Sequence, residues 1–118
     1  MIKVITLLHR RPGMTREEFI EYYESNHRLI GEKYLKPYAS RYVRRFCRPA
    51  TADVLKPAEP PCDVVMEIWF PDQAAFEGAM ADLSTPEAQA EIVADEEKLF
   101  DREKMVSFVV DEYESDLT

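Results

Sequence analysis

The two histidines are the residues best suited to proton transfer, because an imidazole titrates near neutral pH. His27 follows Phe19 and Tyr23 at intervals of four residues, which places it on the apolar stripe of a predicted helix. A ring directed at the core from that stripe can act as a general base or acid beside a substrate carbonyl. A buried histidine that bonds to a backbone carbonyl fits the same pattern. His9 ends the first predicted strand next to two arginines, so it is either exposed or a substrate-binding residue.

Aromatic side chains near His27 and in a later strand can line a pocket for a flat, apolar substrate. Tyr22 and Tyr23 come about one turn before His27, and Trp69 lies in an apolar run. Tyr23 is the candidate whose hydroxyl polarises a substrate carbonyl, and Asn26 is a candidate for orienting a ligand carbonyl. Simple core packing is the commoner explanation of aromatic residues at helical spacing.

Two runs of charge offer further binding groups. The arginines between residues 41 and 48 can bind a carboxylate or phosphate, although an edge strand with salt bridges explains them more simply. The carboxylates of Asp95, Glu96 and Glu97 can supply a partner for His27, although charge runs on helices usually face solvent. The arginines concerned are Arg41, Arg44, Arg45 and Arg48.

Residue types and motifs argue against a bound metal or organic cofactor. Two histidines and two cysteines without CxxC spacing leave few ligands for a metal site. The chain lacks the GxGxxG, GxxxxGK[ST] and HExxH motifs. We therefore predict neither a metal nor a cofactor, and we expect Cys47 and Cys62 to remain thiols in a reducing compartment.

The composition fits one globular domain over residues 1–118. Hydrophobic residues make up 46% of the 118 and charged residues 32%. A net charge of −8 argues against nucleic-acid binding, which depends on neutralising phosphates. No apolar run approaches the ~20 residues of a membrane helix, and the N-terminus lacks the pattern of a signal peptide. We expect a cytoplasmic protein that does not bind membranes.

Charge is divided unevenly along the chain. Residues 1–62 contain 12 basic and 7 acidic side chains, whereas residues 63–118 contain 3 basic and 16 acidic ones. Neither half is large enough to form a useful core by itself. We therefore expect the basic half to pack against the acidic half, within one fold or across a dimer.

The hydrophobic pattern predicts four strands and several helical segments. The first helix begins at a capping box formed by Thr15 and Glu18 and ends at Gly31, or frays on towards Lys33. Later helical segments cover residues 72–83 and 85–99. The strands are expected at residues 3–10, 38–48, 63–70 and 105–110.

The resulting order, β-α-β-β-α-β, is that of the ferredoxin-like α+β fold, an antiparallel sheet with helices on one face. Residues 49–61 form a proline-rich loop and residues 111–118 an acidic tail. Three of the four strands are too apolar for their other face to meet water. We therefore expect a second copy of the chain to cover that face, giving a homodimer with a barrel-like centre.

Two segments carry a more specific pattern. The first runs from a basic pair and a Pro-Gly turn at residues 10–13 into Thr15-Arg16-Glu17-Glu18-Phe19, then Tyr22-Tyr23 and Asn26-His27. The second is the acidic segment at residues 94–101, before the last strand. Together they resemble the EthD-like family of the dimeric α+β barrel superfamily. Family members often have Gly-Pro after the histidine, where this chain has Arg28-Leu29.

The resemblance implies a small cofactor-independent enzyme that acts on a hydrophobic aromatic or polyketide-like carbonyl compound in a catabolic or biosynthetic pathway. In this interpretation His27 moves a proton next to the carbonyl and a tyrosine steadies the oxyanion, as in a dehydratase or cyclase. Two alternatives stay open: a non-catalytic accessory or ligand-binding protein of an oxygenase system, and a cofactor-free monooxygenase. A pocket at His27 favours the catalytic interpretations, whereas a filled core favours the accessory one.

Overall fold

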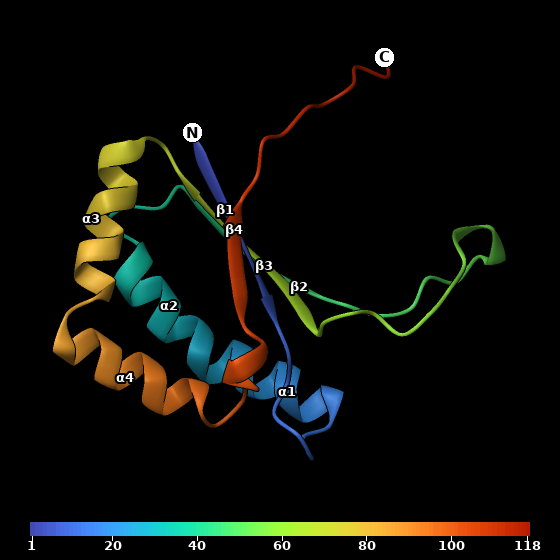
Figure 1. Ribbon diagram of the computed structural model, residues 1–118, viewed down its shortest axis with the longest axis horizontal. Coiled ribbons are helices and arrows are strands. Elements are labelled where there is room, and N and C mark those ends of the chain that lie inside the picture. The colour runs from blue at the N-terminus through green and yellow to red at the C-terminus, as the bar shows by residue number, and fades with distance from the viewer.

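The computed structural model describes all residues from 1 to 118 and contains one four-stranded antiparallel sheet (Figure 1). The spatial order of the strands is β2-β3-β1-β4. This order and the chain order of the elements confirm the ferredoxin-like α+β fold predicted from the sequence. The strands are β1 (Ile2–Leu8), β2 (Arg41–Phe46), β3 (Val64–Phe70) and β4 (Val106–Val109).

Helices follow β1 and β3. None of them combines the length and apolar character needed to cross a bilayer. The first group is one continuous helix made of α1 (Arg16–Tyr22), a π-helical segment η1 (Tyr23–His27) and α2 (Arg28–Leu35). The second group comprises α3 (Gln73–Leu83) and α4 (Pro86–Glu96), and short 3-10 turns lie at η2 (Asp53–Leu55) and η3 (Arg102–Lys104).

The start of the first helix is fixed by the predicted capping box. The Thr15 hydroxyl accepts a hydrogen bond from the Glu18 backbone amide at 3.1 Å. In return the Glu18 carboxylate accepts one from the Thr15 amide at 2.9 Å. Two of the amides that lack a partner inside the helix are thereby satisfied.

The predicted helix end at Gly31 is wrong, because the helix continues to Leu35. Gly31 instead allows the Tyr42 side chain of β2 to pack closely against α2. A Cβ at this position would lie 2.7 Å from the Tyr42 hydroxyl oxygen, so a side chain here would displace the Tyr42 ring of β2. Arg28 and Leu29, which stand where the resembling family often has Gly-Pro, begin α2 and are part of this helix.

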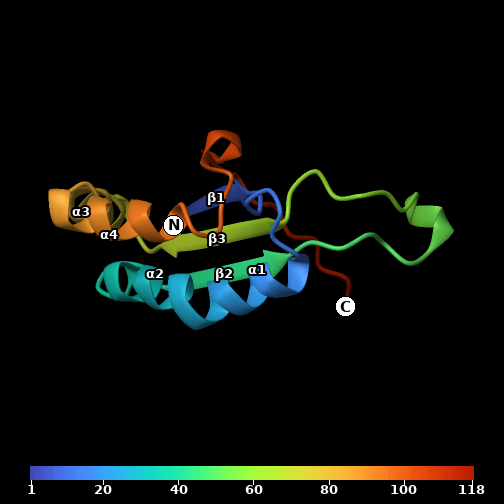
Figure 2. The ribbon, with the colours of Figure 1, turned by 90° about the horizontal axis from the view of Figure 1, so that it is seen from below.

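All helices pack on one face of the sheet, as predicted, and form two hydrophobic clusters with it. One lies around α1 and η1, and the other lies where α2 and α3 meet β3. The first contains Leu8, Phe19, Tyr23, Val64, Leu99 and Phe100, and the second contains Leu35, Ile68, Phe70 and Ala79. Figure 2 shows α1 and α2 along one side of the sheet.

The other face of the sheet, here called the open face, carries the alternate residues of each strand. Apolar side chains on it include Phe108, which is 43% exposed, and Val106, which is 49% exposed. Arg45 donates a 2.7 Å hydrogen bond to Glu67 across β2 and β3, so the basic and acidic halves do meet within the fold. β2 is an edge strand, as its arginines predicted.

The proline-rich loop leaves the body of the protein as a long arm, and the acidic tail extends away separately (Figure 1). Cys47 and Cys62 lie at the base of the arm as free thiols, with their sulfur atoms 4.0 Å apart. Burial, and then the neighbouring Cys47, raises the pKa of Cys62 to about 11. The Cys62 thiol therefore stays un-ionised at neutral pH.

Candidate functional site

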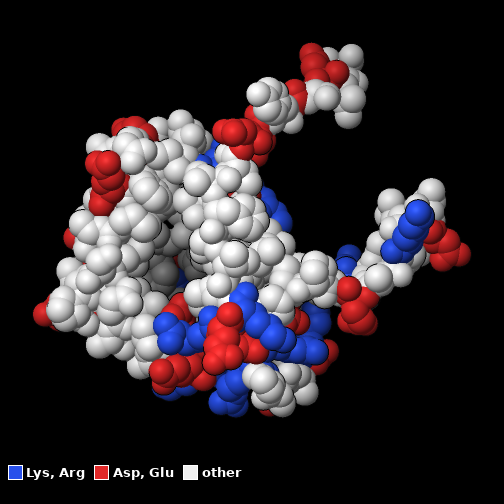
Figure 3. All heavy atoms as spheres, in the orientation of Figure 1, with Lys and Arg blue, Asp and Glu red and all other residues white.

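A cavity of about 370 Å³ lies between the helices and the sheet. This volume is within the range of about 300–1,000 Å³ that is typical of small-molecule pockets. Twelve of its 18 lining residues are hydrophobic, and no lysine or arginine is among them. Figure 3 shows the hollow between the helices and β4, with mostly uncharged side chains around it. A neutral, largely apolar molecule suits this environment.

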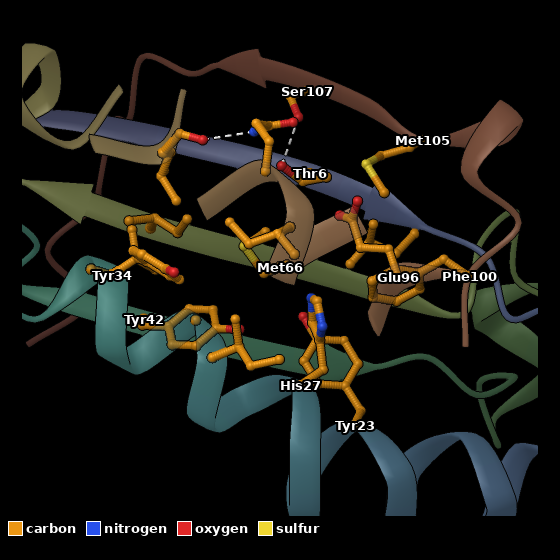
Figure 4. Close-up of a pocket in the computed structure, with 18 residues that line it drawn as sticks. Thr6, Tyr23, His27, Tyr34, Tyr42, Met66, Glu96, Phe100, Met105 and Ser107 are labelled. Carbon is orange, nitrogen blue, oxygen red and sulfur yellow. Dashed lines mark hydrogen bonds between the residues drawn. The ribbon is translucent and has the colours of Figure 1, made fainter. Parts of the chain in front are cut away.

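His27 contributes its ring to the wall of the cavity (Figure 4). It closes the π-helical segment η1 and is 8% exposed. The rings of Tyr23 and Phe100 meet it edge to face, with centroids 5.4 Å and 5.2 Å away. These contacts fix the plane of the imidazole. π-Helical turns inside α-helices occur frequently at functional sites.

The Asp95 carboxylate of α4 determines which nitrogen of His27 can act as a base. His27 Nδ1 lies 2.8 Å from Asp95 Oδ2, and the Tyr22 hydroxyl donates to Asp95 Oδ1 at 2.5 Å. A carboxylate can only accept hydrogen bonds, so Nδ1 must carry the proton. The lone pair of the neutral imidazole is then on Nε2, since the one hydrogen bond of the ring is made through Nδ1.

Glu96 lies next to Asp95 in the sequence but reaches the cavity itself. Burial raises the pKa of its carboxyl above the ordinary value, and the nearby His27 and Arg102 oppose the rise. Arg102 Nε is 3.3 Å from Glu96 Oε1. The cavity thus has a carboxyl group on the wall near the histidine, as Figure 4 shows.

Two tyrosines complete this end of the cavity. Burial, followed by the neighbouring Tyr42, raises the pKa of the Tyr23 hydroxyl well above its ordinary value. Burial also raises the pKa of Tyr42. Both hydroxyls therefore keep their protons at neutral pH and can act as hydrogen-bond donors to an oxygen atom in the cavity.

The family model of the EthD domain matches residues 11–103 of the chain. The protein belongs to the EthD family. The match includes His27, Asp95 and Glu96, so the imidazole, its carboxylate partner and the second carboxyl all lie within the EthD domain. No curated protein matches the chain in sequence.

Solved structures show the same fold at low sequence identity. An EthD family protein from Bacillus halodurans is 18% identical, with a TM-score of 0.64 over 96% of this chain and 100% of that one. A protein from Arabidopsis thaliana is 14% identical, with a TM-score of 0.61 over 99% and 100%. SnoaB, a cofactor-independent oxygenase from Streptomyces nogalater, is 12% identical, with a TM-score of 0.55 over 99% and 97%.

The EthD domain brings together only part of the residue set predicted from the sequence. His27 and Tyr23 line the cavity. Tyr22 lies behind it, bonded to Asp95, and supports the histidine from outside. Asn26 is exposed on the helix surface and its side-chain amide donates to the Tyr22 carbonyl at 3.4 Å, so its expected place in the pocket is wrong.

Trp69 and His9 also lie outside the cavity, contrary to expectation. Trp69 is on the open face, between Lys3 at 3.9 Å and Arg41 at 4.7 Å from its ring centroid. His9 Nε2 is 2.7 Å from the Pro61 carbonyl oxygen, at the base of the arm. Successive side chains of β3 point to opposite faces of the sheet. Ile68 and Phe70 point to the helix-covered face, so Trp69 between them points to the open face.

Sequence reasoning missed the three cavity residues of the sheet that carry a hydroxyl group: Thr6, Tyr42 and Ser107. Thr6 is the one uncharged polar residue of β1, and this was the signal available in the sequence. Its cross-strand partner Ser107 is recognisable only once the register of β1 and β4 is known.

Proposed function

We propose that this EthD protein is a small cofactor-independent enzyme that moves a proton next to the carbonyl group of a hydrophobic aromatic or polyketide-like compound. One observation carries the proposal: His27 borders a substrate-sized cavity, and Asp95 holds its Nδ1. A histidine that merely filled the core would have no adjoining void. The uncharged surroundings of the hollow support a neutral substrate (Figure 3).

In the proposed step, Nε2 of His27 takes a proton from the carbon next to the substrate carbonyl, and the electron pair moves to the carbonyl oxygen. Asp95 stabilises the imidazolium that forms. The Tyr23 hydroxyl donates a hydrogen bond to the developing oxyanion. The imidazolium then returns the proton to carbon or to a leaving hydroxyl, which gives isomerase or dehydratase chemistry.

We further propose that the protein works as a homodimer in the cytoplasm. The open face presents apolar side chains from three strands, including Leu7 of β1, Val65 of β3 and Phe108 of β4. A second copy of the same chain would remove this surface from water by self-complementary packing. The proposal predicts that surface substitutions on the open face alter assembly and leave the cavity intact.

The alternatives differ in what they require of the cavity. A cofactor-free monooxygenase, as SnoaB is described, would begin with the same proton abstraction and then pass the carbanion to oxygen. An accessory protein of an oxygenase system would bind the ligand without exchanging its protons. Proton exchange and oxygen dependence therefore separate the three functions.

The test uses 2-tetralone, a neutral aromatic ketone with acidic protons next to its carbonyl. In D₂O, proton NMR measures how quickly these protons exchange with and without the protein. Wild-type protein should accelerate exchange above the buffer rate, and H27N should return it to that rate. Acceleration under argon, with consumption of the ketone only in air, would favour the monooxygenase. Binding of the ketone without acceleration would exclude both enzymes and leave the accessory protein.

A further inference from the structure

A pair of hydroxyl groups interrupts the apolar sheet wall of the cavity. Thr6 of β1 and Ser107 of β4 are cross-strand neighbours, and their side-chain oxygens are 2.8 Å apart. Both residues line the cavity, together with the apolar side chains of Leu8, Met66 and Ile68. Figure 4 shows the pair across the cavity from His27, with Met66 between them in the view.

The pair has hydrogen-bonding capacity that the protein does not use. Each hydroxyl has one donor and two acceptor lone pairs, and the bond between Thr6 and Ser107 consumes one donor and one lone pair. One hydroxyl proton and several lone pairs are left. Thr6 is 6% exposed and lines the cavity, so a ligand in the cavity is within reach of its hydroxyl. Such a pair both donates to and accepts from a bound group.

The charges around the cavity define which group that is. The lining has no lysine or arginine, and its one acidic residue is Glu96. An anionic group such as a carboxylate would meet no cation and would approach an acidic side chain. A neutral hydroxyl or carbonyl oxygen matches a hydroxyl pair without this penalty.

We propose that Thr6 and Ser107 form a second polar subsite, which binds a hydroxyl or carbonyl oxygen of the substrate at the end opposite to its reacting carbonyl. This inference rests on the proposed function, since it places the reacting carbonyl at His27. It narrows the substrate class to aromatic or polyketide-like compounds with oxygen atoms at both ends of an apolar ring system. Both residues lie outside residues 11–103, the part of the chain that matches the EthD family model.

The two hydroxyls also pair β1 with β4, and a purely structural role would explain their contact. The two roles make different predictions about ligand selectivity. A structural pair contributes equally to the affinity for every ligand, whereas a subsite discriminates between ligands that differ by one hydroxyl group.

The experiment compares the dissociation constants of 2-naphthol and 2,7-dihydroxynaphthalene by titration calorimetry. We expect wild-type protein to bind the diol about three- to tenfold more tightly, as one additional hydrogen bond would give. In T6V, which keeps the shape of the side chain, and in S107A, the ratio should fall to about one. The control S25A removes an exposed hydroxyl from η1, outside this cavity, and should keep the wild-type ratio.

A wild-type ratio of one, or an unchanged ratio in both variants, would overturn the subsite. If T6V fails to fold, S107A decides alone, because Ser107 is exposed on an edge strand. The proposed function fails separately: a preserved preference for the diol without 2-tetralone exchange would support the subsite and contradict proton transfer at His27.

Discussion

The two faces of the sheet carry similar kinds of side chains in different arrangements. On the open face, the Trp69 ring lies between the cations of Lys3 and Arg41, and Arg45 pairs with Glu67, so the charged side chains there already have partners. On the helix-covered face, the free nitrogen of His27 and the Glu96 carboxyl border a void. The charged groups of the open face are paired away from the cavity, whereas the free His27 nitrogen and the Glu96 carboxyl, which also contacts Arg102, lie within reach of a ligand.

The open face is proposed to determine assembly, and the helix-covered face is proposed to determine ligand binding and proton transfer. Substitutions on the helix-covered face should change binding and turnover while the protein keeps its oligomeric state. Substitutions on the open face should do the reverse. Each of the following variants tests this division, in order of decreasing expected effect.

Replacing Asp95 by Asn should have the largest effect. The Asn side chain presents an amide donor to His27 Nδ1, which favours the tautomer that carries its proton on Nε2 and so removes the base. We expect the 2-tetralone exchange rate to fall by about 10²–10⁴-fold. The matched control E97Q changes an exposed carboxyl nearby and should retain the wild-type rate. A D95N protein with full exchange activity would refute the role of Asp95 in orienting the imidazole.

Introducing a charge on the open face should dissociate the proposed homodimer. L7D places a carboxylate among the apolar residues Val65 and Val106 of the neighbouring strands. Light scattering should show a mass near 13.8 kDa for this variant and twice that for wild type. L29D puts the same charge on an exposed helical leucine and should stay dimeric. Wild-type protein at 13.8 kDa across a dilution series would reject the homodimer.

Removing the Tyr22 hydroxyl should weaken the support of Asp95 from behind the cavity. We expect Y22F to lower the free energy of unfolding by about 1.5–3 kcal/mol, the usual range for a hydrogen bond to a charged group. Urea titration gives this value. Y113F removes a hydroxyl from a residue that is 97% exposed and should leave the unfolding midpoint unchanged. Equal midpoints for Y22F and wild type would show that the contact contributes nothing to stability.

Glu96 should make stability depend on pH, because burial raises its pKa above 4.5 in the folded protein. The folded state then holds a proton that the unfolded state releases, so this group stabilises the fold below pH 4.5. Its contribution is lost as pH rises through the raised pKa. We expect E96Q to gain stability relative to wild type as pH rises across this range, by urea unfolding at several pH values. A difference independent of pH would contradict the buried carboxyl.

The sequence was sufficient for those features that depend on local pattern. The capping box at Thr15 fixed the start of the first helix, and its spacing to His27 led to a buried ring. The acidic run near residue 95 was recognised as a source of a carboxylate partner, which is Asp95. These predictions needed only helical periodicity and charge.

Other features depend on long-range packing and could not be read from a local pattern. The π-helical segment widens the turn at Tyr23–His27, so Tyr22 and Asn26 leave the stripe that a regular helix would give them. Trp69 lies outside the cavity because the helices cover the opposite face of the sheet, and the local pattern does not show which face they cover. The pairing of Thr6 with Ser107 requires the register of two strands about a hundred residues apart in the chain.

The most direct test of the central claim uses the fact that the chain has only two histidines. Side-chain nitrogen NMR of ¹⁵N-labelled protein resolves His27, on the cavity wall, and His9, which contacts Pro61. As 2-naphthol is added, the Nε2 signal of His27 should move until it saturates, while both signals of His9 stay in place. A His27 signal that does not move while calorimetry shows the probe to be bound would contradict a ligand site at this histidine.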